Sequence, residues 1–392
     1  MFETMNLRGI ARAVGACLAA LALAATARAD APADSAARPA EYLWVVRTSL
    51  LTRADVVKAV ERAKELGVRG LLVQVVGRGD AYYRSDLLPR AEPIREADFD
   101  PLGTLLPLAH EQGMEVHAWM NCMLVWSDPQ PPRDPTHVLN VHPNWVARMK
   151  DGRRLSDLSA YQRHRLGIEG VFLAPAHPEV RTWVARIASE IATRYPVDGI
   201  HLDYIRQPGV EVGWDPTTRA RFALSSGIDP DRMDRLEPAA RAHADSAWRQ
   251  FQRDQVTAVV REVRDSLERE RPDGIVLSAA VLADSATAEQ RHAQCWGSWL
   301  RSGLLDRAFV MCYAPQIQTV MNQLVDYETR LGVSDRVVPG IAVYNTPPSI
   351  AAAKIKGARA MGYPVLALYS YDALSHKPAY WAALRSLLAP RD

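Results

Sequence analysis

Short runs of apolar residues alternate with longer amphipathic stretches from residue 41 to the carboxyl end of the chain. A short apolar run between turn residues is typical of a buried strand, and apolar residues three and four positions apart predict a helix. The pattern predicts eight strands, at residues 42–48, 70–76, 115–121, 198–203, 274–281, 307–313, 337–344 and 364–370. We expect the helices that follow them at residues 53–66, 101–112, 178–194, 245–270, 286–302, 316–331, 348–361 and 378–388.

Eight consecutive strand–helix units are typical of an α/β protein whose parallel strands close into a (β/α)₈ barrel, the TIM-barrel architecture. Residues 41–392 are therefore predicted to form a single barrel domain. An open doubly wound sheet is the competing fold, and it places a Gly-rich phosphate turn after the first strand. Residues 47–50 are Arg-Thr-Ser-Leu, which favours the barrel.

Loop lengths indicate which end of the barrel carries the functional site. Connections into the strands are short, whereas those that leave strands 2, 3 and 4 run to about 25, 55 and 40 residues. Barrel enzymes build their sites on the face where these loops emerge, and loops of this length are usually functional or disordered. The aromatic residues and histidines of residues 122–177 favour an ordered loop, and we expect Trp126 and Trp145 to form one wall of a groove there.

The amino-terminal residues have the pattern of an export signal. Arg8 and Arg12 precede an apolar run at residues 13–25, and residues 27–29 are Ala-Arg-Ala, which fits the small-residue cleavage pattern. We expect a signal peptide at residues 1–29, a flexible leader at residues 30–40, and an exported protein in the periplasm or the medium. The apolar run is shorter than the roughly 20 residues that span a bilayer, so no membrane span is predicted.

Charge and cysteine content exclude several classes of partner and cofactor. The chain has 47 basic and 45 acidic residues, and removing the first 29 residues takes away three arginines and one glutamate, which leaves no net charge. The basic surface of a nucleic-acid-binding protein is therefore not expected. The mature cysteines, Cys122, Cys295 and Cys312, lack the spacing of a zinc site or a disulfide scaffold. We predict neither a metal nor another cofactor.

The fourth strand carries the strongest candidate for catalysis. Residues 198–208 are DGIHLDYIRQP, and because side chains alternate along a strand, Ile200 and Leu202 should face the helices while His201 and Asp203 face the barrel interior. Asp203 then lies at the catalytic end. Asp198, at the opposite end, is expected to be a turn residue.

Other strand ends and the loops beyond them add polar and aromatic side chains. Aromatic rings stack on sugar rings, and amide, guanidinium and carboxylate groups bind hydroxyls, so this inventory fits a carbohydrate better than a phosphate ester or an apolar ligand. The expected substrate-binding residues are Arg47, Gln74, Tyr82, Trp119, Asn121, Trp126, Tyr204, Arg206, Tyr313, Tyr344 and Asn345.

Several ordered motifs resemble one family over nearly the whole mature chain. They are AHEQGMEVHAW at residues 109–119, HPNW at 142–145, FLAPAHPEV at 172–180, the strand at 198–208, MCYAP at 311–315 and LYSYD at 368–372. Together they resemble the glycosyl hydrolase-like family 10, formerly domain of unknown function 187. The resemblance implies a barrel glycoside hydrolase of the bacterial envelope, with relatives that act on peptidoglycan glycan strands.

The resemblance also shows where this chain departs from its relatives. Some carry Glu at the position of Asn121, and some carry a second acidic residue at the position of Tyr204. Compared with the α-amylase-like pattern, Asp203 occupies the place of the nucleophile and His201 that of an arginine. Ile205 stands where chitinase-like barrels have their catalytic Glu, which excludes that arrangement.

The leading hypothesis is a glycosidase that cleaves a polysaccharide with two carboxyl groups. Asp203 would act as nucleophile or base, and Asp372, Asp80 or Asp284, in that order, would supply the acid. Asp372 ranks first because Leu366, Leu368, Ser370 and Asp372 are expected to share the interior face of the last strand. The alternatives are a carbohydrate-binding barrel that has lost its acid and, less favoured, a metal-dependent hydrolase, for which the usual histidine motifs are missing.

Overall fold

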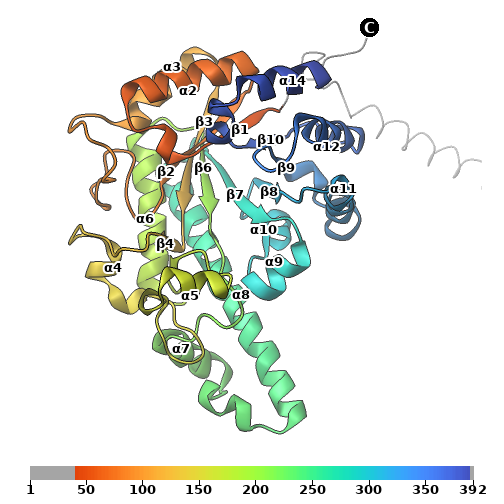
Figure 1. Ribbon diagram of the computed structural model, residues 1–392. Coiled ribbons are helices and arrows are strands. Elements are labelled where there is room, and N and C mark those ends of the chain that lie inside the picture. Colours follow the sequence, from red (N-terminus) through yellow and green to blue (C-terminus); the bar gives the residue numbers. More distant parts are fainter. Residues whose placement is uncertain (1–39, 389–392) are drawn as a thin grey trace, which may run out of the picture.

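Eight parallel strands form a closed barrel in the structure, a computed structural model that describes residues 40–388 (Figure 1). Around the barrel the strands follow their order in the chain, and the last pairs with the first. This confirms the predicted α/β barrel. The expected signal peptide, and the expected leader apart from Ala40, lie outside the described residues. The barrel strands are β1 Tyr42–Val45, β2 Gly70–Val76, β3 Glu115–Asn121, β6 Gly199–Asp203, β7 Val276–Leu282, β8 Arg307–Cys312, β9 Val337–Ala342 and β10 Ala367–Tyr369.

Helices cover the outside of the barrel and connect successive strands (Figure 1). The predicted helix at 286–302 is two helices, because Ala293 adopts a left-handed conformation and ends the first of them. The outer helices are α2 Arg53–Leu66, α3 Pro101–Glu111, α6 Pro178–Arg194, α8 Pro238–Glu270, α9 Ser285–His292, α10 Trp296–Arg301, α11 Ile317–Asp326, α12 Pro348–Ala360 and α14 Pro378–Leu388.

Further short elements lie in the segments that leave the carboxyl ends of the strands. Between β3 and α6, two strands pair in antiparallel fashion to form a small arm. A separate helix, α7, packs on the amino-terminal part of α8, which extends beyond the barrel (Figure 1). The short elements are β4 Leu124–Trp126, α4 Val138–Val141, α5 Ala160–Arg165, β5 Val171–Phe172, α7 Pro216–Ser226 and α13 Tyr371–Ser375.

Aromatic rings fill the barrel interior, and glycine backbones make room for them. A Cβ on Gly340 would lie 2.7 Å from Cη2 of Trp44, and a Cβ on Gly70 would lie 2.4 Å from the Tyr42 ring. Large rings of β1 thus lie against glycine backbones of β2 and β9, as a close-packed barrel requires. The buried interior cluster comprises Tyr42, Trp44, Leu72, Trp119, Phe309, Val338 and Ala367.

The alternation of strand faces was predicted correctly for β6 and wrongly for β10. Ile200 and Leu202 pack in the layer between the strands and the helices, whereas His201 contacts interior rings. In β10 the interior residue is Ala367, and Leu368 belongs to the outer layer. The expectation that Leu366 and Leu368 point inward is therefore wrong.

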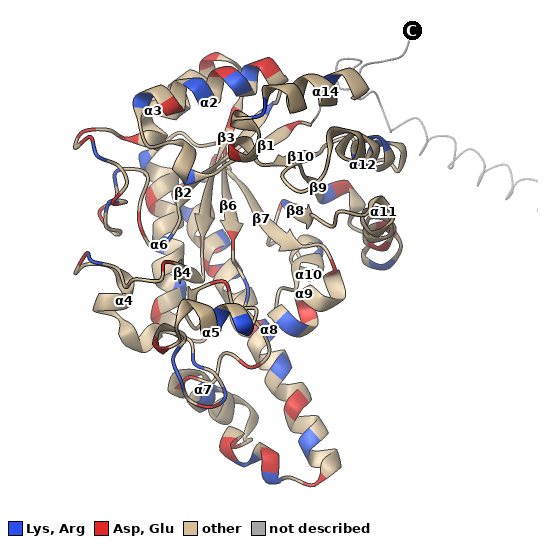
Figure 2. Ribbon diagram, viewed as in Figure 1, with Lys and Arg blue, Asp and Glu red and all other residues tan. Residues whose placement is uncertain are grey.

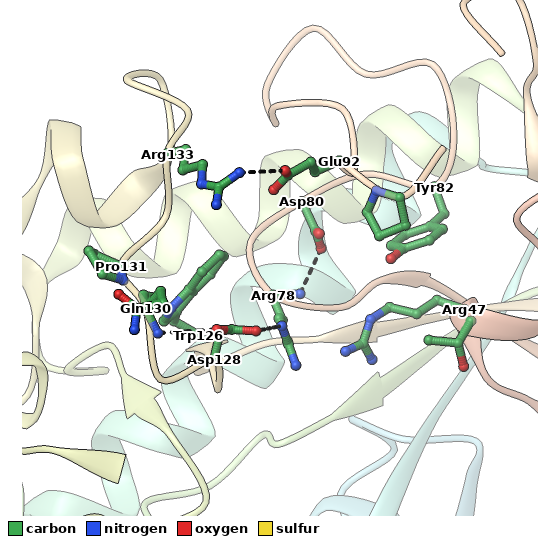
Figure 3. Close-up of a pocket in the computed structure, with 12 residues that line it drawn as sticks. Arg47, Arg78, Asp80, Tyr82, Glu92, Trp126, Asp128, Gln130, Pro131 and Arg133 are labelled. Atoms are coloured by element: carbon green, nitrogen blue, oxygen red, sulfur yellow. Dashed lines mark hydrogen bonds and ion pairs between the residues drawn. The ribbon is translucent and has the colours of Figure 1, made fainter. Parts of the chain in front are cut away.

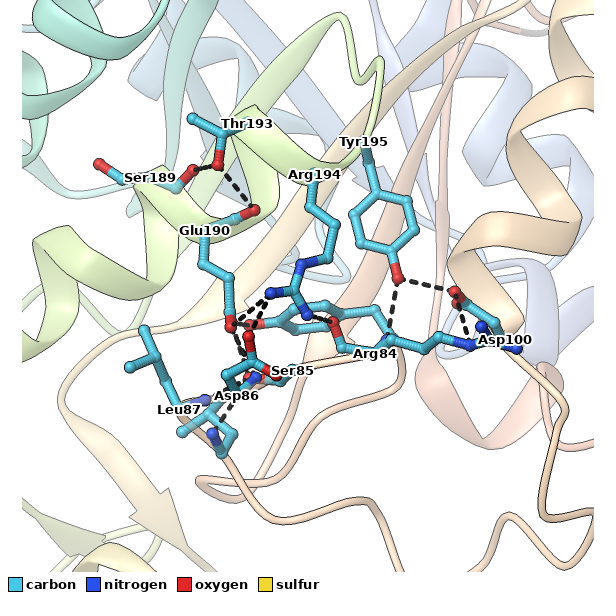
Figure 4. Close-up of polar contacts among 12 residues, drawn as sticks. Arg84, Ser85, Asp86, Leu87, Asp100, Ser189, Glu190, Thr193, Arg194 and Tyr195 are labelled. Atoms are coloured by element: carbon cyan, nitrogen blue, oxygen red, sulfur yellow. Dashed lines mark hydrogen bonds and ion pairs between the residues drawn. The ribbon is translucent and has the colours of Figure 1, made fainter.

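A buried carboxylate on α6 attaches the segment after β2 to the body of the protein (Figure 4). Glu190 accepts hydrogen bonds from the Tyr83 hydroxyl at 2.8 Å and from the Ser85 hydroxyl and the Asp86 N–H, both at 2.6 Å. Close by, the Tyr195 hydroxyl donates to Asp100 at 2.6 Å. These contacts fix both ends of the segment, which also contributes residues to the face where the strands end.

Charged residues of both signs are interspersed along the outer helices, as α2 and α8 show in Figure 2. Within residues 40–388, every helix is too short or too polar to cross a membrane. The three cysteines of this part of the chain, Cys122, Cys295 and Cys312, are free thiols.

The close approach of Trp44 to Gly340 leads to a prediction about stability. Gly340→Ala should lower the free energy of unfolding by about 1–3 kcal/mol, because the added methyl group meets the indole ring and the Val310 carbonyl oxygen. Urea denaturation measures the change. Gly209→Ala is the control, since nothing lies within 4 Å of its added Cβ, and it should change stability by less than about 1 kcal/mol. Equal stability of the two variants would contradict the packing argument.

Candidate active site

Asp203 lies at the carboxyl end of β6, with its side chain turned into the barrel mouth. Its Oδ2 accepts a hydrogen bond from the Trp119 indole N–H at 3.1 Å, and its Oδ1 accepts one from the Tyr204 backbone N–H at 2.6 Å. Tyr204 has a φ of 50°, which is unusual for a bulky residue. This left-handed turn directs the chain away from the strand immediately after Asp203.

Burial changes the ionisation of this carboxyl group. Asp203 is only 8% exposed, and loss of hydration raises its pKa to about 6. The two donated hydrogen bonds and the guanidinium of Arg206 oppose this increase without cancelling it. A carboxyl group that exchanges its proton near pH 6 is suited to acid–base chemistry in mildly acidic to neutral solution.

A cavity of about 150 Å³, which we call the mouth cavity, opens above Asp203. A chain of hydrogen bonds orients its amides: Arg47 donates to Gln74 Oε1 at 2.9 Å, Gln74 donates to Asn121 Oδ1 at 3.2 Å, and Asn121 donates to the Gly77 carbonyl at 2.7 Å. The lining residues are Val46, Arg47, Gln74, Gly77, Trp119, Asn121, Leu124, Ser127, Glu169, Asp203, Tyr204 and Tyr369.

A second depression of about 330 Å³, the side groove, is drawn in Figure 3. It shares Arg47 with the mouth cavity. Ion pairs join Arg78 to Asp128 at 2.7 Å and Arg133 to Glu92 at 3.2 Å. Its lining residues are Arg47, Thr48, Arg78, Asp80, Tyr82, Glu92, Pro93, Trp126, Asp128, Gln130, Pro131 and Arg133. Both depressions therefore combine aromatic rings with hydrogen-bonding groups, as expected for a carbohydrate site.

The floor of the mouth cavity is uncharged. His201, directly below Asp203 in β6, accepts a hydrogen bond from the Trp44 indole at 3.2 Å and contacts the Ser278 hydroxyl at 2.9 Å. Burial, with a smaller contribution from His117, holds the pKa of His201 well below its usual range. His201 is thus a neutral packing residue of the interior.

Three tyrosines surround the opposite side of the mouth. Tyr313 stacks on Tyr369 with ring centroids 5.1 Å apart, and Tyr344, which is 49% exposed, meets both rings edge to face. Asn345 donates to the Tyr313 carbonyl at 2.9 Å. Tyr313, Tyr344 and Asn345, which the sequence analysis expected to bind sugar, form a rim. Of the three tyrosines, only Tyr369 lines the mouth cavity, and the sequence analysis overlooked it.

The three expected partners of Asp203 are not among the residues that line the mouth cavity. Asp372 is in α13 and accepts a hydrogen bond from Ser370, so the strand geometry that ranked it first is wrong. Asp284 caps α9 by accepting from the Thr287 N–H at 2.6 Å, outside both depressions. Asp80 lines the side groove and accepts from the Arg78 N–H at 2.8 Å.

The two tryptophans of the β3 segment occupy different environments. Trp126 lines the side groove and donates to the Gln130 carbonyl at 2.7 Å. Trp145 is 7% exposed, stacks on His142 and packs against Trp183, so its expected place in a groove wall is wrong. It belongs to the core that supports the segment.

Glu169 is the one other carboxylate that lines the mouth cavity, and sequence reasoning missed it. It pairs with Arg206 at 2.6 Å. Arg206, an expected binding residue, is buried and stacks on Tyr204, with its guanidinium carbon 5.0 Å from the ring centroid. The sequence does contain a pattern that could have identified Glu169. It is an acidic residue in a short segment bounded by glycines, Gly167-Ile168-Glu169-Gly170, just before a short apolar run.

A barrel with a carboxyl group, aromatic rings and hydrogen-bonding side chains at its carboxyl-terminal face defines the glycoside hydrolase class of TIM-barrel proteins. The family model of Glycosyl hydrolase-like 10 matches residues 42–351. The chain belongs to this family, which confirms the resemblance found in its motifs.

Curated relatives carry the same class of name. The chain is 28% identical over 212 residues to "Glycosyl hydrolase DigH" of Escherichia coli K12, covering 50% of this chain and 44% of that protein. It is 21% identical over 227 residues to "Glycosyl hydrolase YngK" of Bacillus subtilis, covering 56% and 38%. The matched region thus spans less than half the length of either relative.

Solved structures share the barrel. The PgaB (BpsB) glycoside hydrolase domain from Bordetella bronchiseptica superposes with a TM-score of 0.66 at 17% identity, over 90% of this chain and 99% of that one. The catalytic domain of β-amylase from Paenibacillus polymyxa gives 0.59 at 10% identity, over 88% and 97%. At these identities the likeness establishes the fold.

The pKa of Asp203 leads to a prediction about pH-dependent stability. Because folding raises this pKa, the stabilising contribution is complete below about pH 4 and is lost as the pH rises through about 6. The free energy of unfolding of the wild type, measured relative to Asp203→Asn, should fall by up to about 3 kcal/mol over this range. Urea denaturation of both proteins between pH 4 and 7 measures it, and a constant difference would contradict the shifted pKa.

Proposed function

We propose that the protein is an exported glycoside hydrolase that cleaves a polysaccharide of the bacterial envelope, namely the glycan strands of peptidoglycan. Asp203 supplies one of its two catalytic carboxyl groups. The proposal depends mainly on one observation: a buried carboxyl group with a pKa of about 6 lies at the base of a cavity lined by aromatic and amide side chains.

The surroundings of Asp203 support binding of a sugar chain. Trp119 and Tyr369 offer ring faces in the mouth cavity, and Gln74 and Asn121 are held by hydrogen bonds, so their remaining donors and acceptors have fixed directions. Arg47 connects this cavity to the side groove, which provides room for neighbouring sugar units. Family membership and the export pattern of the first 29 residues support an envelope substrate.

Replacement of the central carboxyl group tests the activity. Asp203→Asn should reduce the release of reducing ends from purified peptidoglycan glycan strands by at least about 1,000-fold, because an amide cannot exchange the proton or attack the anomeric carbon. The assay uses strands with and without stem peptides. Wild-type protein that binds the strands without cleaving them would instead indicate a carbohydrate-binding barrel.

Asp198→Asn is the matched control, since Asp198 precedes the same strand at the opposite end of the barrel. Its Oδ2 accepts from the Val116 N–H at 2.7 Å, which is a structural contact. This variant should keep activity within a few-fold of wild type. Full activity of Asp203→Asn would refute the assignment of Asp203.

Export is tested on the protein purified from the periplasm or the medium. Sequencing should find a mature amino terminus at Asp30, since signal peptidase cleaves after the Ala-Arg-Ala pattern of residues 27–29. A cytoplasmic protein that retains Met1 would refute export while leaving the proposed activity unaffected.

A further inference from the structure

We propose that Glu169 is the second catalytic carboxyl group and acts as the general base, with Asp203 as the general acid of an inverting reaction. The inference rests on the proposed glycosidase function and assigns the partner that function requires. Glu169 takes the place of Asp372, Asp80 and Asp284 as the partner of Asp203, and the roles differ from those expected from the sequence, since Asp203 is now the acid.

The location of Glu169 is the first argument. Among the residues that line the mouth cavity, Asp203 and Glu169 are the two with carboxyl groups. They come from different elements, since Asp203 ends β6 and Glu169 precedes β5 in the arm that leaves β3. A sugar unit in this cavity would therefore contact two carboxyl groups that separate parts of the chain supply.

The backbone around Glu169 is held in a fixed position. The next residue, Gly170, lies so close to β4 that a Cβ there would be 2.2 Å from the Trp126 carbonyl oxygen. Val171 then pairs with Trp126 in the antiparallel arm. A side chain at residue 170 would force β4 and β5 apart, so the glycine permits the approach that brings Glu169 to the cavity.

The two carboxyl groups have opposite environments. Glu169 pairs with the guanidinium of Arg206 at 2.6 Å, and 42% of its side chain is exposed to solvent. Asp203 is buried and accepts its hydrogen bonds from an indole and a backbone amide. Such a difference separates a base from an acid in paired carboxyl sites.

The chemistry follows from these two states. Asp203 transfers its proton to the glycosidic oxygen as the bond from C1 to that oxygen breaks, and the bonding electron pair stays on the oxygen. Glu169 removes a proton from a water molecule whose oxygen forms the new bond to C1 on the opposite face. The products are two shorter glycans, an ionised Asp203 and a protonated Glu169, and proton exchange with solvent restores both groups.

Glu169→Gln tests the assignment on peptidoglycan glycan strands, with Glu179→Gln as the matched control. Glu179 is an exposed glutamate in the first turn of α6 and lines neither depression. Glu169→Gln should lower kcat by about 100-fold or more with KM within a few-fold, because an amide cannot accept the proton of the attacking water. Glu179→Gln should stay within two-fold of wild type.

The stereochemistry gives an independent readout. NMR of the first product formed by the wild type should show an inverted anomeric configuration. Azide should restore turnover to Glu169→Ala, because azide attacks C1 without a base, and it should yield a glycosyl azide. Retained configuration, or a Glu169→Gln variant within ten-fold of wild type, would overturn the assignment.

Arg206 acts through Glu169 as a positioning residue, since its guanidinium pairs with that carboxylate at 2.6 Å. Arg206→Gln should lower kcat with KM within a few-fold, and Arg206→Lys, which keeps a positive charge near Glu169, should restore part of the loss. If the wild type cleaves glycans and Asp203→Asn does not, normal activity of Glu169→Gln overturns this inference alone. If the wild type cleaves none, the proposed function and this inference fail together.

Discussion

The close packing of aromatic rings against glycine backbones inside the barrel determines where the strand ends lie. Trp44 of β1 lies against Gly340 of β9, and Tyr42 of β1 lies against Gly70 of the neighbouring strand β2, so both rings pack directly on backbone. Trp119 and Tyr369 pack on these rings at the carboxyl-terminal end of the barrel, with their ring centroids 6.5 Å apart. Because these rings form the floor of the mouth, the indole N–H that holds Asp203 is itself fixed by the interior packing.

The strands could be located from the sequence because each buried strand is a short apolar run, and β6 also ends in a polar residue, Asp203. In β6 the alternation of Ile200 and Leu202 with His201 and Asp203 distinguishes the two faces. The residues around β10, Val365-Leu366-Ala367-Leu368-Tyr369, are apolar on both faces and give no such distinction. The face was therefore assigned wrongly, so Asp372 was expected on the last strand and Tyr369 was overlooked.

Glu169 could not be located from the sequence because its position depends on contacts between distant segments. The arm formed by β4 and β5, the turn after Asp203 and the stacking of Arg206 on Tyr204 together bring it to the cavity. Each belongs to a connection after a strand, where local patterns carry little information about long-range packing. The same connections contribute the side groove, so the residues that distinguish this site from other barrels lie mainly outside the strands.

The uncharged floor below Asp203 has a consequence for proton transfer. Trp119 and the neutral His201 separate the carboxyl group from the polar residues at the other end of the barrel, Glu115 and Arg307. The cavity that Asp203 lines is therefore its contact with solvent. In the proposed reaction a bound sugar would cover this contact, so the proton already on Asp203 at the moment of binding would be the one that passes to the leaving group.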